Sequence, residues 1–355
     1  MARYKKRPAF DESVPGLFDD LEDTSFFQGG ATMPIYPAIE KAARQAAAAR
    51  AAERKDRKDM FGLDDFSPLE VSTTVDRLNF ISFGSGSSGN CAYVGDGEKG
   101  ILIDAGVAPD VVKGELARHG IKMESILGVI VTHDHSDHVR FIYNLVRKRF
   151  YMGVYCTPRV LNGMLRRHNI SNRIKDYHHP IYKEHPFRLG NFTITAFEVQ
   201  HDGTDNAGFH ITYGAHTLVV ATDLGCISER ADFYMRLANY LMIEANYDDT
   251  MLTNGTYAEY LKARIRSATG HLDNKVTAEY IRTIYTPKLR NIFLCHLSKD
   301  NNTPETALRE VESALLASGV SVGDGSNSPY ARSAAVQLMA LPRFDATPLI
   351  PLTLK

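Results

Sequence analysis

The sequence predicts an α/β protein, in which a layered domain of strands and helices follows a charged N-terminal extension. Two observations predict this class. Short apolar segments alternate with helical stretches from Leu78 onward, and several of the apolar segments end in a histidine or an aspartate. With 355 residues, 44% of them hydrophobic, the chain is long enough to bury a substantial core. We therefore expect functional side chains to gather where strands end.

Residues 1–75 differ from the rest of the chain in composition. An acidic opening punctuated by proline and glycine leads into AIEKAARQAAAARAAERKDRKD, which favours helix but offers almost no apolar stripe to bury. We expect residues 1–75 to form a mostly disordered or partly helical extension and residues 76–355 to form the folded domain. A solvated tail and an arm that binds a protein partner both fit this composition.

From Leu78 onward, seven β-branched or aromatic runs bounded by Gly, Asn or Asp are typical of strands. In chain order they are RLNFISF, GILIDAG, ILGVIVTH, NFTITAF, HTLVVATD, YLMIEAN and NIFLCH. Helices are expected between several of them, at residues 139–149, 158–168, 256–267, 276–285 and 304–317. Thr303 is the expected N-cap of the last helix, with Pro304 in its first turn.

The global charge and the absence of apolar leaders limit the partners and the compartment. The 41 basic and 42 acidic residues nearly cancel, so any attraction to a polyanion must be local. No apolar run approaches the roughly 18 residues that a spanning helix needs, and the opening stretch MARYKKRPAFDESVPGLFDD has basic residues but no apolar h-region. The four cysteines lack CxxC spacing. We expect a soluble, cytoplasmic protein with no membrane partner.

Four predicted strands end in a side chain that can bind metal: His133, His201, Asp223 and His296. In α/β sheets, sites collect beyond the carboxyl ends of the strands, where loops present polar groups on a rigid frame. One histidine at a strand end would suggest a hydrogen-bonded structural residue. Four strand ends, one of which opens the cluster HDHSDH at 133–138, favour a metal site instead.

The spacing within this cluster indicates a site for two ions. The first two histidines are two residues apart in an extended segment, so they share a face, whereas the last two ligands follow as the chain turns into a helix. The predicted set is, for one ion, His133, His135 and His201; for the other, Asp137, His138 and His296; and, bridging both, Asp223. Imidazole and carboxylate ligands suit Zn or Mn, and Fe is compatible with them. Burying such groups with local hydrogen bonds alone would be costly.

These residues together resemble the metallo-β-lactamase superfamily. The matching stretches are ILIDAG with Asp104, THDHSDH, the strand-end His201, ATDLG with Asp223, and CHLSKDNN with His296. Within the superfamily the chain resembles the bacterial WalJ (YycJ-like) exonuclease group. The stretches that carry this second resemblance are GSGSSGN at 84–90, IEANYD at 243–248, SATGHLDN at 267–274 and LCHLSKDNNTPE at 294–305. The match covers residues 78–345 and says nothing about the extension.

The resemblance implies a fold and an activity. The fold would be an αββα four-layer sandwich with a dinuclear site at one edge of two facing sheets. The activity would be a metal-dependent phosphodiesterase, a 5′ to 3′ DNA exonuclease linked to mismatch repair, in which two ions activate water. Asp104 would orient a ligand or the loops around the ions.

Glu244 and His271 resemble the Glu–His pair that assists the leaving oxygen in tRNA 3′-processing relatives. On this interpretation His271 donates the proton, because a carboxylate that orients an imidazole makes it a competent general acid. The predicted catalytic residues are then Asp137, Asp223, Glu244 and His271. Alternatively, Glu244 caps a strand end and His271 caps the helix that follows.

A basic segment supports a nucleic-acid substrate. Residues 139–188 hold eleven Lys or Arg against two acids, a surplus of nine in a chain of nearly zero net charge. The candidate phosphate contacts are Arg140, Arg147, Lys148, Arg149, Arg166 and Arg167. The aromatic residues of this segment either stack on bases or belong to the core. In GSGSSGN, the residues Ser87, Ser88 and Asn90 are weaker candidates, because the same string makes an ordinary turn.

Three other functions remain open beside DNA hydrolysis, which we expect in preference to RNA hydrolysis. An RNA-processing nuclease would share the Glu244–His271 pair, but only 47 residues separate Asp223 from His271, too few for a large inserted domain. A small-molecule hydrolase of thioesters, lactones or lactams would use the same ions without needing the positive surplus. A non-catalytic protein would act through residues 1–75.

Overall fold

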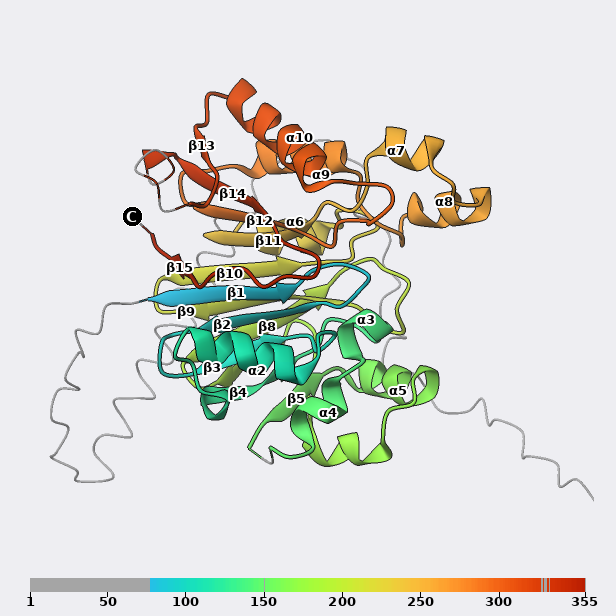
Figure 1. Cartoon of the computed structure of the whole chain (residues 1–355), viewed down its shortest axis with the longest axis vertical. Coiled ribbons are helices and arrows are strands. Elements are labelled where there is room, and N and C mark those ends of the chain that lie inside the picture. The colour runs from blue at the N-terminus through green and yellow to red at the C-terminus, as the bar shows by residue number, and fades with distance from the viewer. Residues whose placement is uncertain (1–76, 150, 327, 329–330, 332, 355) are drawn as a thin grey trace, which may run out of the picture. The chain divides into compact units, whose positions relative to one another are not determined.

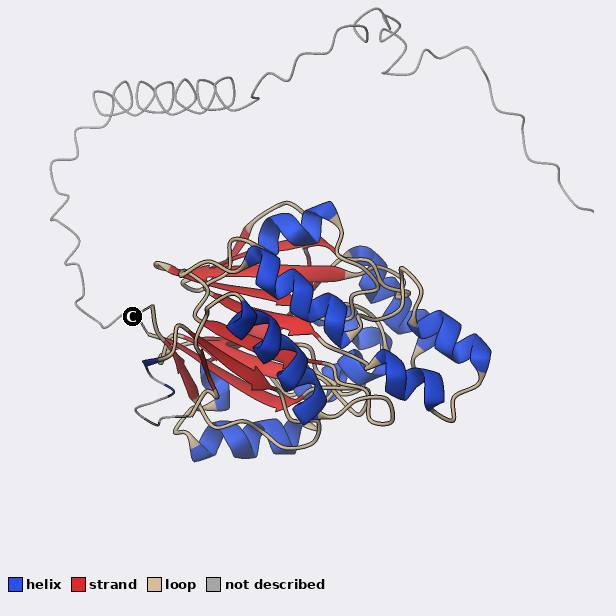
Figure 2. Ribbon diagram, turned by 90° about the horizontal axis from the view of Figure 1, so that it is seen from above, coloured by secondary structure: helices blue, strands red, loops and turns tan. Residues whose placement is uncertain are grey.

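The computed structural model describes residues 77–149, 151–326, 328, 331 and 333–354. The predicted extension, residues 1–75, lies outside the described residues. Two β-sheets stack face to face, and helices cover their outer faces (Figures 1 and 2). The predicted α/β class and its αββα layering are thereby confirmed. Within the described ranges, no helix combines the length and the apolar character required to span a bilayer.

The first sheet is built mainly from the first half of the described chain. Its strand order is β15-β1-β2-β3-β4-β5-β6, antiparallel from β15 to β3 and parallel from β3 to β6. The strands are β1 (Leu78–Gly84), β2 (Cys91–Gly95), β3 (Gly100–Ile103), β4 (Ile126–Ile130), β5 (Gly153–Cys156), β6 (His178–Pro180) and β15 (Ile350–Leu352).

The second sheet follows in the chain and has the order β13-β14-β12-β11-β10-β9-β8-β7. Strands β10, β11, β12 and β14 are parallel, and β8 runs in the same direction because β9 is antiparallel to both β8 and β10. The strands are β7 (Phe187–Leu189), β8 (Phe192–Glu198), β9 (Ala207–Tyr213), β10 (His216–Ala221), β11 (Tyr240–Glu244), β12 (Asn291–Cys295), β13 (Val322–Gly323) and β14 (Val336–Ala340).

The helices divide between the two outer faces and one end of the sandwich. They are α2 (Pro109–Arg118), α3 (Ser136–Val139), α4 (Ile142–Val146), α5 (Pro158–Arg167), α6 (Glu229–Met235), α7 (Asp249–Asn254), α8 (Glu259–Ile265), α9 (Asn274–Ile284) and α10 (Pro304–Ala317), with 3-10 turns at Met123–Ser125 and Asn172–Tyr177. Helices α2, α4 and α5 pack on the first sheet, whereas α6, α9 and α10 pack on the second. Helices α7 and α8 lie together at one end (Figure 1).

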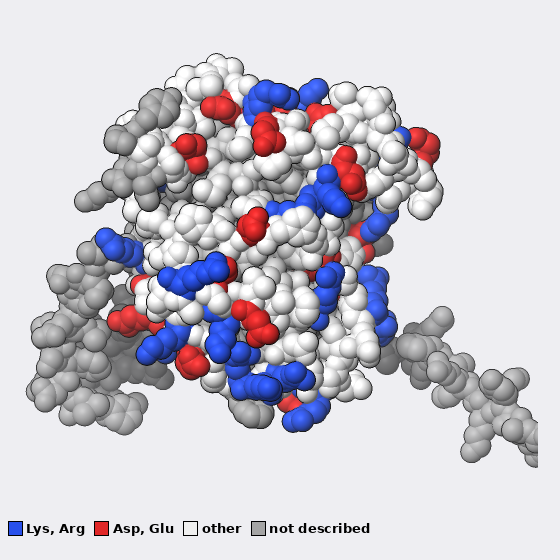
Figure 3. Space-filling view, viewed as in Figure 1, with Lys and Arg blue, Asp and Glu red and all other residues white. Residues whose placement is uncertain are grey.

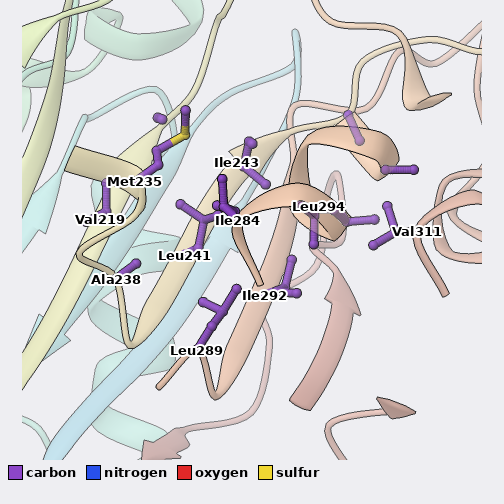
Figure 4. Packing of buried hydrophobic residues seen from close by; sticks show 14 of the residues in the cluster. Val219, Met235, Ala238, Leu241, Ile243, Ile284, Leu289, Ile292, Leu294 and Val311 are labelled. Carbon is purple, nitrogen blue, oxygen red and sulfur yellow. The ribbon is translucent and has the colours of Figure 1, made fainter. Parts of the chain in front are cut away.

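Alternating side chains of each strand fill the spaces on either side of its sheet. On β11, Leu241 and Ile243 face the covering helices, where Ile284 of α9 and Val311 of α10 join the same cluster (Figure 4). Tyr240 and Met242 instead point into the space between the two sheets. Because both faces are buried, such strands read as continuous apolar runs, and they form a rigid frame for the loops at their ends.

Most predicted elements are found, including strands at all seven predicted runs and the Thr303 cap, whose hydroxyl accepts from the Thr306 N–H. The single helix predicted over 139–149 is wrong, because the structure divides this stretch between α3 and α4. Ala105 causes the break: its N–H donates to the carbonyl of His138, and its carbonyl accepts from the N–H of Phe141. The helix predicted at 256–267 is limited to α8.

Candidate metal centre

The loops that follow β4, β8, β10 and β12 bring the predicted ligands together. His133 and His135 lie in the extended segment after β4, and Asp137 and His138 lie on the short helix α3. Three further ligands follow strands of the second sheet, namely His201, Asp223 and His296. The cluster therefore draws side chains from both sheets, as expected when strands of one direction end at a common edge.

The first predicted ligand group is His133, His135 and His201, whose ligand atoms lie within 4.8 Å of one another. His201 Nδ1 lies 3.0 Å from the carbonyl oxygen of Gly270. A carbonyl only accepts, so Nδ1 carries the proton and the neutral ring presents a lone pair at Nε2. His201 Nε2 lies 3.3 Å from His135 Nδ1. His133 Nδ1 lies 3.1 Å from the Thr132 hydroxyl.

This group fits a divalent cation. His133 Nε2 is buried and has no hydrogen-bond partner among the described residues, an arrangement that costs free energy unless something occupies the nitrogen. Tetrahedral nitrogen ligands placed about 2.0–2.1 Å from Zn²⁺ are separated by roughly 3.3–3.4 Å. The measured separation of His201 Nε2 and His135 Nδ1, 3.3 Å, agrees with that spacing.

The second predicted group is Asp137, His138 and His296, also within 4.8 Å. A carboxylate faces the Nδ1 atom of each imidazole: Asp104 Oδ2 lies 2.8 Å from His138 Nδ1, and Glu244 Oε1 lies 2.9 Å from His296 Nδ1. Both Nε2 atoms are left to face Asp137 Oδ2, at 3.6 Å and 3.4 Å respectively. Such carboxylate–histidine pairs orient imidazoles in metal sites.

Asp223 lies between the two groups. Its Oδ2 is 3.3 Å from His138 Nε2, and its Oδ1 is 3.6 Å from His201 Nε2 and 3.3 Å from His296 Nδ1. The side chain is buried, and Oδ2 also accepts a hydrogen bond from the Thr222 hydroxyl. One carboxylate thus faces both predicted ligand groups, which is the position a bridging ligand requires.

The backbone is strained where strands deliver these side chains. Asp104, Asp223 and His296 have φ values of 60°, 55° and 54°, in the left-handed region that non-glycine residues rarely adopt. This conformation costs about 1–2 kcal/mol per residue and persists only where the surrounding structure enforces it. Here it turns the chain sharply at a strand end and directs the side chain into the cluster.

The electrostatics of the cluster favour positive charge between its carboxylates. Burial alone would raise the pKa of Asp223, but the charges of His296 and His138 outweigh it and hold that pKa well below its ordinary value. Burial opposes charge on His296, yet Asp223, Asp137 and Glu244 raise its pKa to about 10. Protons and divalent cations therefore compete for the same space.

Glu244 is fully buried and contacts both the predicted proton donor and a predicted ligand. Its Oε1 lies 2.7 Å from His271 Nδ1 and 2.9 Å from His296 Nδ1. Its Oε2 accepts from the N–H groups of Leu224 and Leu272. The pairing of Glu244 with His271 was expected, whereas the contact with His296 was not. The hydrogen bond between His271 and Glu244 therefore uses Nδ1 of the ring and not Nε2.

Two of the six Lys and Arg residues predicted to contact phosphate lie beside the predicted metal ligands. Arg140 Nη1 lies 3.4 Å from the carbonyl oxygen of Ser88, and Arg167 Nε lies 3.7 Å from Asp134 Oδ2, so both border the cluster. Arg166 donates to the carbonyl of Asn162 on its own helix. Three others follow α4 and make no hydrogen bond or ion pair with a predicted ligand in the described part of the chain: Arg147, Lys148 and Arg149.

The loop GSGSSGN supports the ligands more directly than expected. Asn90 Nδ2 lies 3.1 Å from Asp137 Oδ2 and 2.9 Å from His138 Nε2. Asn90 Oδ1 accepts from the N–H of Gly86, which closes the turn. Ser87 Oγ lies 3.5 Å from Arg343 Nη1. The amide of Asn90 therefore faces the second ligand group.

Sequence reasoning missed three residues around the ligands. Asn246 Nδ2 lies 3.2 Å from His296 Nδ1 and donates to the His296 carbonyl. Asp134 is buried and accepts from the N–H and hydroxyl of Thr204. Asp202 Oδ1 lies 3.3 Å from His135 Nε2. The available signal was adjacency, since Asp134 and Asp202 each follow a predicted ligand directly and Asn246 lies within IEANYD.

Comparisons with known proteins agree with this geometry. Residues 99–296 match the family model of the beta-lactamase superfamily domain. The chain is 32% identical over 247 residues to exodeoxyribonuclease YycJ of Bacillus anthracis, covering 70% of this chain and 92% of that protein. It is 31% identical over 239 residues to exodeoxyribonuclease WalJ of Streptococcus pneumoniae serotype 2 (strain D39), covering 67% of this chain and 88% of that protein.

A solved structure shares the architecture. The metallo-beta-lactamase fold protein YhfI from Bacillus subtilis matches with a TM-score of 0.53 and 17% sequence identity, over 77% of this chain and 99% of that chain. At this identity the match establishes the fold alone.

Proposed function

This chain belongs to the beta-lactamase superfamily and is a metal-dependent hydrolase of phosphodiester bonds, and from that premise we propose that it is a 5′ to 3′ DNA exonuclease acting in DNA repair. One observation carries the proposal. A complete set of seven ligand-type side chains converges in a chain that aligns with 92% and 88% of two exodeoxyribonucleases. An interaction protein without activity would have no use for this set.

In the proposed site, the two ligand groups and Asp223 would hold two divalent ions, Zn or Mn with Fe as a compatible third choice. When bound, such ions lower the pKa of water and neutralise the charge that develops on phosphate. Nitrogen and oxygen donors without thiolate fit these metals. The donors come from four separate loops, so the site requires the whole domain to be folded.

The chain's own residues position the reacting groups and move a proton. Asp104 and Glu244 orient the imidazoles of His138 and His296 through the contacts at their Nδ1 atoms. Glu244 also faces His271 Nδ1 at 2.7 Å, so His271, as an imidazolium, would give its Nε2 proton to the departing oxygen and keep the proton on Nδ1. The side chain of His271 is 19% exposed, so it lies within reach of a substrate at the surface.

Basic residues beside the cluster suit a polyanionic substrate. Arg140 and Arg167 border the ligand loops and can contact phosphates on either side of the cleaved bond. In the view of Figure 3, Lys and Arg side chains are more frequent in the lower half, with Asp and Glu lying among them, and Figure 1 places helices α2 and α4 there. A hydrolase of small neutral molecules would need no such surplus.

A panel of candidate substrates tests the proposal. Purified protein, loaded with Mn or Zn, is incubated with duplex DNA labelled at the 5′ end or the 3′ end, with RNA, with bis(p-nitrophenyl) phosphate and with a chromogenic lactam. Release of mononucleotides from the 5′ end of DNA is expected, and Asp223→Asn protein is the control. Faster cleavage of RNA would favour the RNA-processing alternative, and turnover of the lactam alone would overturn nuclease activity.

We also propose a cytoplasmic location, where DNA is accessible, and a protein-binding role for residues 1–75. A chain that begins at residue 76 should retain the nuclease activity of the full chain. Loss of an interacting protein in affinity capture with the shorter chain would support the role of the extension. Loss of activity instead would place residues 1–75 in the catalytic domain.

A further inference from the structure

Two aromatic side chains are exposed at the end of the sandwich that holds the ligand loops. Among the large apolar and aromatic residues that the structure describes, Tyr260 and Phe344 are the most exposed, at 79% and 66%. Tyr260 is on α8, which Figure 1 shows at the same end as α3. Phe344 follows β14, which runs parallel to β12 and therefore ends at the same edge. A single exposed apolar residue is ordinary, but two at one site indicate a binding surface.

Helix α8 places Tyr260 beside the first ligand group. Arg264 lies one turn after Tyr260, so the two side chains share a face of the helix. The Arg264 Nη2 and Nε atoms lie 2.6 Å and 2.7 Å from Oδ2 of Asp202, the residue that directly follows the ligand His201. The carbonyl of the last residue of α8 accepts from the N–H of His271, the predicted proton donor. Both contacts fix α8 against the site.

Phe344 lies beside the second ligand group. The guanidinium carbon of Arg343 is 5.9 Å from the centroid of the Phe344 ring. The same guanidinium donates to the carbonyl of Leu297, which directly follows the ligand His296. Its Nη1 atom also lies 3.5 Å from Ser87 Oγ in the loop after β1. Arg343 therefore holds the Phe344 segment between two loops that reach the second ligand group.

The loop after β12 connects these two positions. Leu297, at its start, contacts Arg343, and Asp300, further along, accepts a hydrogen bond of 2.8 Å from the hydroxyl of Tyr257, just before α8. We call Tyr260, Phe344 and this connecting loop, residues 297–302, the aromatic rim. The arginines beside the rim are already paired with a carboxylate or a carbonyl. The rim therefore offers ring faces rather than unpaired positive charge.

Ring faces of this kind suit unpaired nucleobases. Every base has a π-face, so stacking on an aromatic side chain tolerates any sequence, as an enzyme that digests a strand end requires. The aromatic residues of the basic segment fit this role less well, because Tyr143 packs against the core under the helices of the first sheet and Tyr155 packs between the sheets.

On the premise of the proposed nuclease function, we propose that Tyr260 and Phe344 are base-stacking subsites for unpaired nucleotides of the substrate strand. Tyr260 receives a base beside the first ligand group, and Phe344 receives one beside the second. The phosphates between these bases then pass over the ligand cluster. Stacking on the rim supplies binding that does not depend on charge, in addition to the phosphate contacts of Arg140 and Arg167.

Two oligonucleotides separate stacking from phosphate contact. The first is a thymidine oligomer of about 12 nucleotides, within the range of common single-strand sites, and the second has the same backbone without bases. Phosphorothioate linkages keep the charge and resist cleavage, so full-length protein loaded with Mn or Zn can be used. Affinities are measured by fluorescence anisotropy at low and high salt.

Four variants are compared with wild type. Tyr260→Ala and Phe344→Ala each remove a ring, and Tyr260→Phe keeps the ring without its hydroxyl. The matched control is Phe233→Ala, because Phe233 is 51% exposed and also lies against an arginine, with Arg230 5.1 Å from its centroid. Phe233 is on α6, which packs on the outer face of the second sheet.

Loss of a ring should weaken binding of the oligomer that has bases. Tyr260→Ala and Phe344→Ala should each bind the thymidine oligomer about 5-fold or more weakly, and the oligomer without bases less than about 2-fold more weakly. The loss should be equal at low and high salt, because no charge is removed. Tyr260→Phe and Phe233→Ala should match wild type.

Each contrary result is distinct. Wild-type affinity of Tyr260→Ala and Phe344→Ala for the thymidine oligomer would overturn the stacking subsites and leave the nuclease proposal standing. Equal losses for both oligomers would show that the rings support the shape of the surface, and would also overturn the subsites. Wild-type protein that binds neither oligomer would overturn the proposed nuclease function together with this inference. Circular dichroism checks that each variant is folded.

Discussion

Replacement of Glu244 by glutamine would disturb the two imidazoles that share this carboxylate. Glu244 is fully buried, and its oxygens divide their partners: Oε2 accepts from the N–H groups of Leu224 and Leu272, while Oε1 lies 2.7 Å from His271 Nδ1 and 2.9 Å from His296 Nδ1. Glutamine keeps the shape but exchanges one oxygen for an NH₂ group. In either orientation, that group meets two donors instead of offering them an acceptor.

The expected loss of stability follows from the number of buried donors that are left without an acceptor. Each buried donor left without an acceptor costs about 1–3 kcal/mol, so two of them lower the free energy of unfolding by about 2–6 kcal/mol. The free energy of unfolding of a typical domain is only about 5–15 kcal/mol in total. An NH₂ group facing His296 also favours the ring form protonated at Nε2, which can no longer bind a cation there. We therefore expect metal affinity to fall about 10–100-fold as well.

Urea unfolding of chelated protein, followed by circular dichroism, measures the first effect, and chelator competition measures the second. The control is Glu279→Gln, because Glu279 is an exposed residue of α9 that pairs with Arg282 on the same helix. The control should change unfolding by no more than about 0.5 kcal/mol. If Glu244→Gln matches the control in both measurements, Glu244 does not orient the two imidazoles.

Three further predictions concern the bridge, the ions and a buried ion pair. Asp223→Asn should keep its circular dichroism spectrum, because asparagine tolerates a φ of 55°, but its nuclease turnover should fall at least about 100-fold. Full activity in this variant would show that Asp223 does not bridge the two ions. Dialysis against EDTA should abolish nuclease activity and Mn or Zn should restore it, whereas activity that survives chelation would contradict metal dependence. Lys183→Met should lower the free energy of unfolding in urea by about 1–3 kcal/mol, because Lys183 Nζ lies 2.6 Å from the partly buried Asp205 Oδ1; an unchanged value would show that the pair contributes nothing. Burial raises the pKa of Asp205, but hydrogen bonds from Lys183 and Thr157 outweigh it and hold that pKa below its ordinary value. Its stabilisation is therefore present above the unfolded pKa of 3.8 and lost as pH falls through the lower folded value, so acid unfolding below about pH 4 should be shallower in Lys183→Met.

The ligand positions were accessible from sequence because each follows an apolar run that reads unambiguously as a strand. The clearest cases are His133, Asp223 and His296, whose strands are buried on both faces and therefore leave little doubt about where they end. Strands of one direction in a sheet bring their carboxyl ends to one edge, so residues more than 150 positions apart were expected to meet. The ligand groups within 4.8 Å are the result.

What the sequence left undetermined depends on contacts between distant segments. The contact of Glu244 with His296 joins residues 52 positions apart and has no periodic signal. The break between α3 and α4 arises from backbone hydrogen bonds to Ala105, which override the local preference for helix. The basic residues 147–149 illustrate the same limit, because nearness to the cluster in sequence did not bring them into contact with it.

The supply of ligands from both sheets has a consequence during synthesis on the ribosome. A chain released only as far as β11 has the ligands at 133–138, 201 and 223 but lacks His296, so the second ligand group is incomplete. Domains assemble from the N-terminus as they emerge, and a partly made copy of this protein would hold an unfinished centre. On the proposed mechanism, a nascent polypeptide that ends before His296 cannot hydrolyse DNA, because the second ligand group lacks one of its three members.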